Sequence, residues 1–176
     1  GNICKKLGVD TYEVFQGVGL DHRINPSFFK AGIGFGGSCF PKDIRALISK
    51  AEELGEETRI LKSVMKLNEE QPLKLIQILK KYMSDLKDRT IGILGLAFKP
   101  DTDDVRESRA IPVIRTLIKE GAKVIAYDPV ANENFRKIFP DIVYVSNPEE
   151  VLNSEAILIL TEWEEFERLD YSGKMV

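Results

Sequence analysis

The spacing of the hydrophobic positions changes near residue 86, and this change divides the chain into two halves. From residue 2 to about residue 84, apolar residues recur at every third or fourth position, which is the helical period. After residue 89, short apolar runs alternate with helical stretches, as in parallel strands joined by crossover helices. The pattern therefore predicts a mixed α/β chain, with a helical segment over 1–86 followed by a Rossmann-like parallel sheet over 87–176.

The helical half begins with short helices that are bounded by glycine and capping residues. Gly8 should end the first helix, and Asp10 or Thr11 should cap a second that reaches about Gly17. A third helix is expected over 41–54, where Gly55 follows as a stop.

A fourth helical pattern begins at Glu57 and meets Pro72. Proline removes a backbone N–H and clashes with the preceding turn, so we expect a kink or a short break over 68–71. The apolar seam of this pattern is long, and it is typical of a domain connector or of an oligomer interface. An ordinary core helix is an equally good interpretation of the periodicity.

The second half should form a sheet whose first turn is unusual for a nucleotide-binding fold. Strands are expected at 90–94, 123–127, 143–145 and 156–160, with helices at 110–119, 131–138 and 148–152. The turn at 92–97 reads Gly-Ile-Leu-Gly-Leu-Ala and lacks the Gly-x-Gly-x-x-Gly fingerprint that holds a dinucleotide pyrophosphate. Asp128 follows the second strand, where an acid could hold a ribose, but Asp-Pro is also a common turn opener and we favour the turn.

Composition limits the cellular locations and the classes of partner that fit this chain. Of the residues, 43% are hydrophobic and 30% are charged, and the formal net charge is −3. No apolar run approaches the roughly 18 residues of a membrane span, and nothing at the start resembles a signal peptide, so a cytoplasmic location without a membrane partner is expected. The 25 basic residues are scattered among 28 acidic ones, which argues against nucleic acid as a partner.

The cysteines and the histidine offer no metal site or disulfide framework. Cys4 lies in a helical pattern and is most simply a packing residue, which leaves Cys39 without a predicted partner. His22 is the only histidine and has no readable partners for a metal or for a cysteine-histidine dyad, so we expect no metal.

The run 34–43 reads Gly-Phe-Gly-Gly-Ser-Cys-Phe-Pro-Lys-Asp and carries the clearest chemistry. Its glycines allow a tight turn, and Pro41 suits the first turn of a helix, so Cys39 should lie at a helix N-terminus. Such positions, or a neighbouring cation such as Lys42, can lower a cysteine pKa to about 3.5 to 7.5, which would make the thiol a candidate nucleophile. A buried cysteine in a glycine turn is an equally good interpretation, and Asp43 fits either a base or a cap.

Four motifs together resemble one enzyme family. They are the run 34–43; Leu-Ala-Phe-Lys-Pro-Asp-Thr-Asp-Asp-Val-Arg-Glu-Ser at 96–108; Ala-Tyr-Asp-Pro at 126–129; and Leu-Thr-Glu-Trp at 160–163. In this order they are similar to the signatures of the UDP-glucose and GDP-mannose dehydrogenases, and they cover nearly the whole chain.

The resemblance implies a four-electron oxidation of a primary alcohol to a carboxylate that uses two molecules of NAD. Cys39 would capture the intermediate aldehyde as a thiohemiacetal and then carry a thioester, because a thiolate is both a good nucleophile and a good leaving group. Asp43 would help to activate or orient the water that hydrolyses the thioester. Lys42 and Arg106 would face NAD, although either could be a surface charge.

The resemblance also implies residues that bind the nucleotide sugar. Its pocket would be lined by one segment, which contains Phe28, Phe29, Lys30, Gly32, Gly34 and Phe35. The pyrimidine end would be contacted by Phe98 and Lys99. Arg23 would reach into the site of a neighbouring subunit, since family members pair as homodimers through the central helix. Core aromatics and solvated charges are the alternatives for these residues.

The resemblance further implies that the chain is a fragment. The family's N-terminal domain, which supplies most of the NAD contacts, would be absent, as would a lysine and an asparagine upstream of residue 2, and the chain would end at the start of a strand. The residues after Cys39 favour UDP-glucose over GDP-mannose as the substrate. A catalytically inactive module that only binds nucleotide and dimerises is the alternative.

Overall fold

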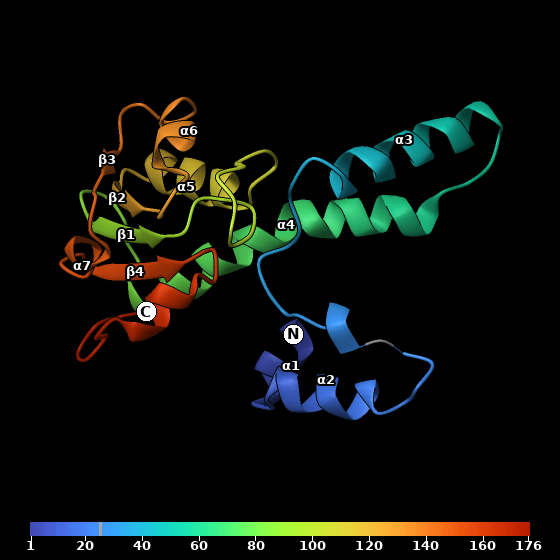
Figure 1. Ribbon diagram of the computed structural model, residues 1–176, viewed down its shortest axis with the longest axis horizontal. Coiled ribbons are helices and arrows are strands. Elements are labelled where there is room, and N and C mark those ends of the chain that lie inside the picture. Colours follow the sequence, from blue (N-terminus) through green and yellow to red (C-terminus); the bar gives the residue numbers. More distant parts are fainter. Residues whose placement is uncertain (25) are drawn as a thin grey trace.

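The computed structural model describes residues 1–24 and 26–176, with Phe28 described in its backbone alone (Figure 1). The helices are α1 (Asn2–Leu7), α2 (Thr11–Gly19), α3 (Phe40–Glu53), α4 (Arg59–Tyr82), α5 (Ala110–Lys119), α6 (Asn132–Arg136) and α7 (Pro148–Val151), with 3-10 helices η1 (Pro26–Phe28) and η2 (Glu164–Arg168). The strands are β1 (Thr90–Leu94), β2 (Lys123–Tyr127), β3 (Val143–Tyr144) and β4 (Ala156–Ile159). The expected α/β class is confirmed, and the strands of the second half begin where the hydrophobic pattern placed them.

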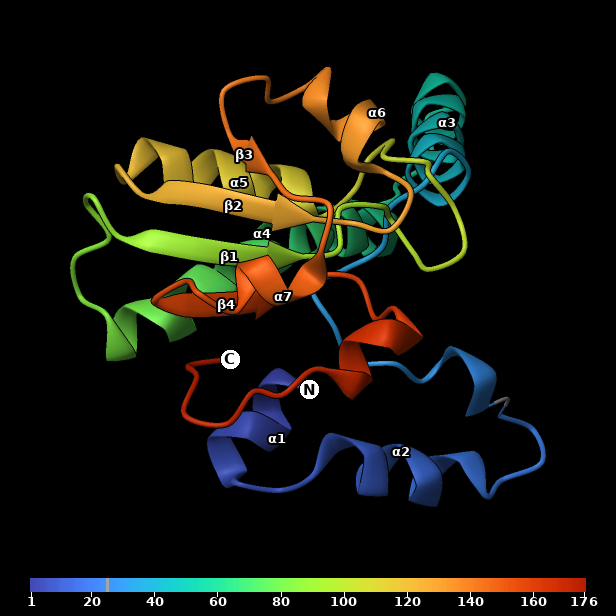
Figure 2. The same cartoon turned by 60° about the vertical axis from the view of Figure 1, so that its left-hand side comes forward.

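The strands form one parallel sheet in the order β3-β2-β1-β4, and Figure 2 shows them one above another in this order. Ile91 of β1 lies in register with Val124 of β2 and with Ala156 of β4. Beyond β4, the backbone carbonyl of Met175 accepts a hydrogen bond of 2.8 Å from the amide of Ile157. The last residues therefore run beside the edge of the sheet.

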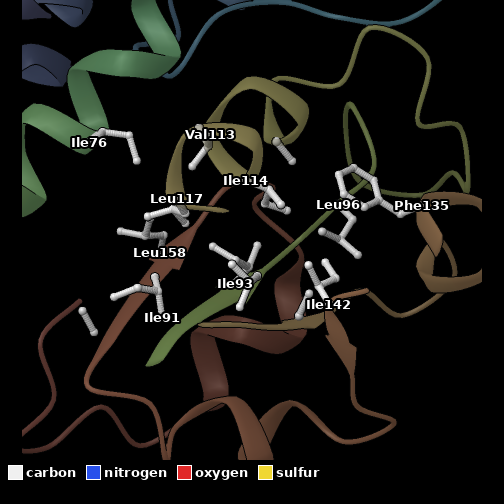
Figure 3. Packing of buried hydrophobic residues seen from close by; sticks show 14 of the residues in the cluster. Ile76, Ile91, Ile93, Leu96, Val113, Ile114, Leu117, Phe135, Ile142 and Leu158 are labelled. Carbon is white, nitrogen blue, oxygen red and sulfur yellow. The ribbon is translucent and has the colours of Figure 1, made fainter. Parts of the chain in front are cut away.

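Alternate residues of each strand enter two different cores. One core lies under α4, α5 and α6, and part of it is shown in Figure 3; it includes Ile91 and Ile93 of β1 with Ile76 and Leu79 of α4. The second core lies on the other face, under α7 and η2, and takes Leu94 from β1. Because the end of α4 belongs to the first core, this helix joins the helical half to the sheet, and the division at residue 86 stays a prediction.

Helix α4 runs without interruption through Pro72, so the break predicted at 68–71 is not formed. Pro72 has no N–H to donate to the carbonyl of Asn68, one turn earlier. That carbonyl accepts a hydrogen bond of 3.4 Å from Nη1 of Arg109 instead. A side chain from the neighbouring segment thus replaces the bond that the proline removes, which explains why the helix continues.

The N-terminal helices lie apart from the sheet in both views and have little core of their own (Figures 1 and 2). Neither α1 nor α2 contains a buried residue. Their boundaries follow the sequence signals, since Gly8 ends α1 with a left-handed φ of 67° and the Asp10 side chain accepts from the amide of Tyr12. Several of their apolar side chains are exposed, among them Ile3 and Leu7 of α1.

Asp128 fixes the turn after β1. Its carboxylate is buried and accepts hydrogen bonds from the amides of Leu96, Ala97, Val130 and Ala131 and from the indole of Trp163. Asp128 therefore has the turn role that we favoured. Both of its carboxylate oxygens accept hydrogen bonds from the chain itself, five in all, so a ribose is not needed to explain this buried acid.

The space beside the glycines of the same turn is filled by other parts of the chain. A β-carbon on Gly92 would lie 2.6 Å from Cγ1 of Val151, and one on Gly95 would lie 2.5 Å from Cβ of Thr161. The close approach that a dinucleotide pyrophosphate needs at such a turn is therefore taken up by protein packing. This agrees with the absent fingerprint.

Within the described part of the chain, no helix is both long and apolar enough to cross a bilayer. The same residues contain no group of three or more histidine, cysteine, aspartate or glutamate side chains that could hold a metal ion.

Candidate functional site

Cys39 stands at the N-cap of α3 with an exposed side chain. Its carbonyl accepts a 2.8 Å hydrogen bond from the amide of Asp43, which closes the first turn of the helix. Its Sγ lies 3.7 Å from Oγ of Ser38. The predicted helix start is confirmed to within one residue, and the buried interpretation of this cysteine is wrong, because the thiol is open to solvent.

The glycine turn before Cys39 is docked on the loop that contains the second motif. The amide of Gly37 donates a 2.9 Å hydrogen bond to the carbonyl of Arg106. A β-carbon on Gly36 would lie 2.3 Å from the carbonyl oxygen of Glu107, and one on Gly37 would lie 2.7 Å from the ring of Phe98. Two motifs about 60 residues apart in the sequence thus meet at Cys39, and the glycines allow the contact.

The charged side chains beside Cys39 surround a depression of about 510 Å³. Lys42 and Arg106 both line it, and their assignment to NAD stays a prediction. Nζ of Lys42 lies 3.1 Å from Oδ1 of Asp43, so its charge is directed at that carboxylate. The side-chain hydrogen bonds that Arg106 donates to Asp104 raise the pKa of Arg106, and the thiol of Cys39, when ionised, adds to the same shift.

The segment expected to line the sugar-nucleotide pocket is held by contacts of several kinds. Phe29 stacks on Phe15 of α2 at 5.4 Å, and the carbonyl of Gly32 accepts from the side chain of Gln71. Nζ of Lys30 lies 3.1 Å from Oε1 of Glu162, which belongs to the fourth motif.

The remaining predicted residues lie in different surroundings. Nζ of Lys99 lies 5.7 Å from the centre of the Phe98 ring, so these two predicted residues lie side by side, and their contact with the substrate stays a prediction. Arg23 is exposed and bonded to Asp21 of its own chain. The side chain of Phe28 is outside the described residues.

The structure therefore brings together one group of predicted residues and leaves others apart from it. The group around Cys39 contains the adjacent Asp43 and Lys42 with the more distant Phe98 and Arg106. Lys30 contacts the sheet half through its ion pair with Glu162, whereas Arg23 pairs with Asp21, two residues before it in the sequence.

A polar cluster behind the site was not predicted from the sequence. Nη1 and Nη2 of Arg45 lie 2.8 and 3.3 Å from the carboxylate of Glu107, and Nη2 of Arg109 lies 3.1 Å from the same carboxylate. The hydrogen bond from Arg45 is the main reason why the pKa of Glu107 is lowered. Glu107 also has a left-handed φ of 53°, which is uncommon for a residue other than glycine.

Asn68 was missed as well. Its side chain is buried and binds the backbone of Phe35, within the glycine turn over 34–39. The one signal for it in the sequence was a polar residue in the apolar seam, four positions before Pro72.

Comparison with known proteins decides the family. The model of the central domain of the UDP-glucose/GDP-mannose dehydrogenase family matches residues 1–70, and the model of its UDP binding domain matches residues 92–175. The chain belongs to this family. The resemblance found in the four motifs is thereby confirmed.

The relatives extend over much more sequence than this chain. It is 48% identical over 170 residues to UDP-glucose 6-dehydrogenase AglM of Haloferax volcanii, covering 96% of this chain and 39% of that protein. A solved UDP-glucose dehydrogenase from the hyperthermophilic archaeon Pyrobaculum islandicum matches with a TM-score of 0.93 and 50% identity, over 96% of this chain and 40% of that one. The GDP-mannose dehydrogenase of Pseudomonas aeruginosa matches with a TM-score of 0.72 and 33% identity, over 94% and 40%.

Proposed function

We propose that this chain is the part of an NAD-dependent UDP-glucose 6-dehydrogenase that carries the nucleophile and the UDP-sugar-binding half. The observation that carries the proposal is the docking of the glycine turn before Cys39 on the loop that holds Phe98, Arg106 and Glu107. This contact joins an exposed thiol to the sheet half that matches a UDP binding domain. The identities of 48% and 50% with UDP-glucose enzymes support the choice of reaction.

The thiol of Cys39 supplies the covalent chemistry. Oxidation of the primary alcohol of the sugar gives an aldehyde, and the sulfur adds to its carbonyl carbon, forming a C–S bond in a thiohemiacetal. A second loss of hydride from the same carbon gives a thioester. Water then attacks the thioester carbonyl, the C–S bond breaks, and the sulfur leaves as thiolate beside the new carboxylate.

NAD, when bound, accepts the hydride at each of the two oxidations. The filled turn after β1 does not fit its pyrophosphate, so we propose that NAD is held mainly by parts of the protein outside this chain. The depression beside Cys39 fits one end of the cofactor, because Lys42 and Arg106 place cations and N–H donors at its wall.

Asp43 is proposed to orient the water that hydrolyses the thioester. It lies one turn along α3 from Cys39, and its carboxylate is exposed, so a water molecule can reach both groups. Nζ of Lys42 lies 3.1 Å from Oδ1 of this carboxylate, so its positive charge can hold the carboxylate in place.

The substrate is proposed to lie between the 28–35 segment and the sheet half. Lys30, with its partner Glu162, joins these two parts, and Phe98 and Lys99 present an aromatic face and a cation on the sheet side. The other proposed contacts are Phe28, Phe29, Gly32, Gly34 and Phe35. Arg23 is proposed to act in the site of a second subunit, since its own side chain is exposed.

A homodimer in the cytoplasm is the proposed state of the complete protein. Apolar side chains remain exposed on the helical half, among them Ile60 and Leu67 of α4. Exposed apolar side chains gathered on one part of a molecule favour burial against another subunit. The charged fraction of 30% is close to that of soluble globular domains, which agrees with this location.

The complete natural protein provides the test. With UDP-glucose it should reduce two molecules of NAD for each uronate formed, it should act poorly on GDP-mannose, and Cys39→Ser should stop acid formation. Unchanged uronate production by Cys39→Ser would refute the covalent role. Residues 1–176 alone should bind UDP in a calorimeter without reducing NAD, and turnover by them would contradict the need for further residues.

A further inference from the structure

Asn68 joins helix α4 to the glycine turn through both polar groups of its side chain. Its Oδ1 accepts a hydrogen bond of 2.7 Å from the amide of Phe35, and its Nδ2 donates one of 2.9 Å to the carbonyl of the same residue. Only 5% of Asn68 is exposed. A side-chain amide that binds both the N–H and the C=O of one residue fixes the position and the direction of that backbone. A single hydrogen bond would fix its position alone.

The turn is shaped to receive this side chain. Gly34 has a left-handed φ of 111°, and a β-carbon on it would lie 2.5 Å from Oδ1 of Asn68. Glycine at this position therefore permits a close approach that any other residue would prevent. The fit indicates that the contact between Asn68 and the turn is specific.

The backbone of Asn68 takes part in the same attachment. Pro72 leaves the Asn68 carbonyl without its helical partner, and Arg109 donates to it. Arg109 also donates to the carbonyl of Glu107, against which Gly36 packs. Asn68 therefore contacts the turn directly and also contacts the residue that holds the opposite wall.

Cys39 lies at the end of this attachment. From Phe35 the chain passes Gly37, whose amide is bonded to Arg106, and reaches Cys39 two residues later. After Cys39, the first turn of α3 is closed by the amide of Asp43. Helix α3 fixes the thiol from one side, and Asn68 supplies the side-chain anchor on the other.

We propose that Asn68 is a positioning residue for the cysteine chemistry, holding the turn 34–39 so that the thiol of Cys39 faces the site beside Arg106. This inference rests on the proposed function. Its consequence is selective: loss of Asn68 slows capture of the aldehyde by Cys39, while the pocket that binds the nucleotide end is retained.

The test compares Asn68→Ala with Ile76→Ala in the complete protein. Ile76 is a buried residue of the same helix on the sheet side, so its truncation lowers stability without touching the turn.

We expect Asn68→Ala to lower kcat for uronate by about tenfold or more, because a displaced reacting group loses its alignment, and to change the KM for UDP-glucose by less than about threefold. Aldehyde trapped with a hydrazine should exceed the amount trapped from the unaltered protein. Ile76→Ala should keep both kcat and the trapped fraction at the level of the unaltered protein.

A role of Asn68 in stability alone would give a different result. Both variants would then melt at lower temperature, and kcat below the melting range would be unchanged in each. That outcome overturns the proposal, as does a fall in kcat without extra aldehyde.

A second measurement does not depend on turnover. Cys39 in the folded protein is alkylated with iodoacetamide, and its modified peptide is followed by mass spectrometry. We expect alkylation in Asn68→Ala to be slower by about threefold or more, because the sulfur moves away from the positive charge of Arg106, while its exposure is already high. If the complete protein reduces no NAD but the alkylation rate responds, the proposed function fails and the positioning role stands. Equal rates in Asn68→Ala and the unaltered protein overturn the positioning role.

Discussion

The carbonyl oxygen of Glu107 occupies the space where a β-carbon on Gly36 would stand, at 2.3 Å. Heavy atoms of two residues do not approach so closely, so Gly36 is the only residue that the contact admits without displacement. The contact lies three residues before Cys39 and one residue after Arg106. It links the segment that carries the thiol directly to the loop of the sheet half.

Gly36→Ala should therefore displace the turn or the loop at Glu107. We expect the free energy of unfolding to fall by about 1 to 3 kcal/mol, as for other overpacked sites. Because the displacement reaches Cys39, kcat should fall by about tenfold or more in the complete protein. Urea unfolding and steady-state rates measure the two effects.

Gly17→Ala is the matched control. Gly17 lies in α2, and a β-carbon on it would meet nothing within 4 Å. Alanine in a helix is favoured over glycine by about 0.5 to 1 kcal/mol, so stability should rise slightly and kcat should not change. Equal losses in the two variants would show that the contact at Glu107 has no special role.

Glu107 predicts a pH-dependent stability. The hydrogen bond from Arg45 lowers the pKa of Glu107 from its ordinary value near 4.5. A carboxyl whose folded pKa is depressed adds stability above its unfolded pKa, and this stability is lost as pH falls through the folded pKa. The protein should be more stable than Glu107→Gln at pH 7, and the difference should shrink as pH falls below about 4.5. Urea midpoints at several pH values measure it, and a constant difference between pH 7 and pH 3 would contradict the ionic role.

Asp128→Asn should destabilise the sheet half. The amide cannot accept all five hydrogen bonds, and its NH₂ group must face backbone N–H groups that are buried. Unsatisfied donors of this kind cost about 1 to 3 kcal/mol each, so we expect a loss of about 3 kcal/mol in urea unfolding. Asp141→Asn, at an exposed position, should change stability by less than about 0.5 kcal/mol. A loss for Asp128→Asn as small as that of the control would refute this role.

The dimer is tested at Leu67, which is 56% exposed on α4. The complete protein should sediment as a dimer at micromolar concentration, and Leu67→Glu should shift it towards monomer, because a buried charge without a partner is costly. Gln77→Glu adds the same charge at an exposed polar position of α4 and should leave the dimer intact. A clean monomer before any substitution would count against the interface.

Hydrophobic periodicity was sufficient to predict most elements of the sheet half. Strands such as β1 alternate between two buried faces, with Ile91 and Ile93 on one and Leu94 on the other, and this local pattern is visible in the sequence. Helix boundaries at Gly8 and near Pro41 followed from local backbone chemistry in the same way.

The errors and omissions concern contacts between distant residues. The sequence around Pro72 predicts a kink or a break. The helix is not broken, because Arg109, which is 37 residues away, donates the hydrogen bond that the proline cannot supply. Asn68 was placed only within the predicted kink or break, because its partner, Phe35, precedes it by 33 residues. The local sequence around a residue does not show which side chain the fold will bring to it.

Covalent capture on Cys39 is tested most directly by Asp43→Asn in the complete protein, because this variant should form the thioester and hydrolyse it slowly. The protein is mixed with UDP-glucose and NAD, quenched in acid and digested, and the peptide that contains Cys39 is weighed by mass spectrometry. We predict that this peptide carries the uronyl group of the nucleotide sugar through sulfur, and that Cys39→Ala carries none and makes no uronate. Uronate formed by Cys39→Ala at the rate of the unaltered protein would contradict the account.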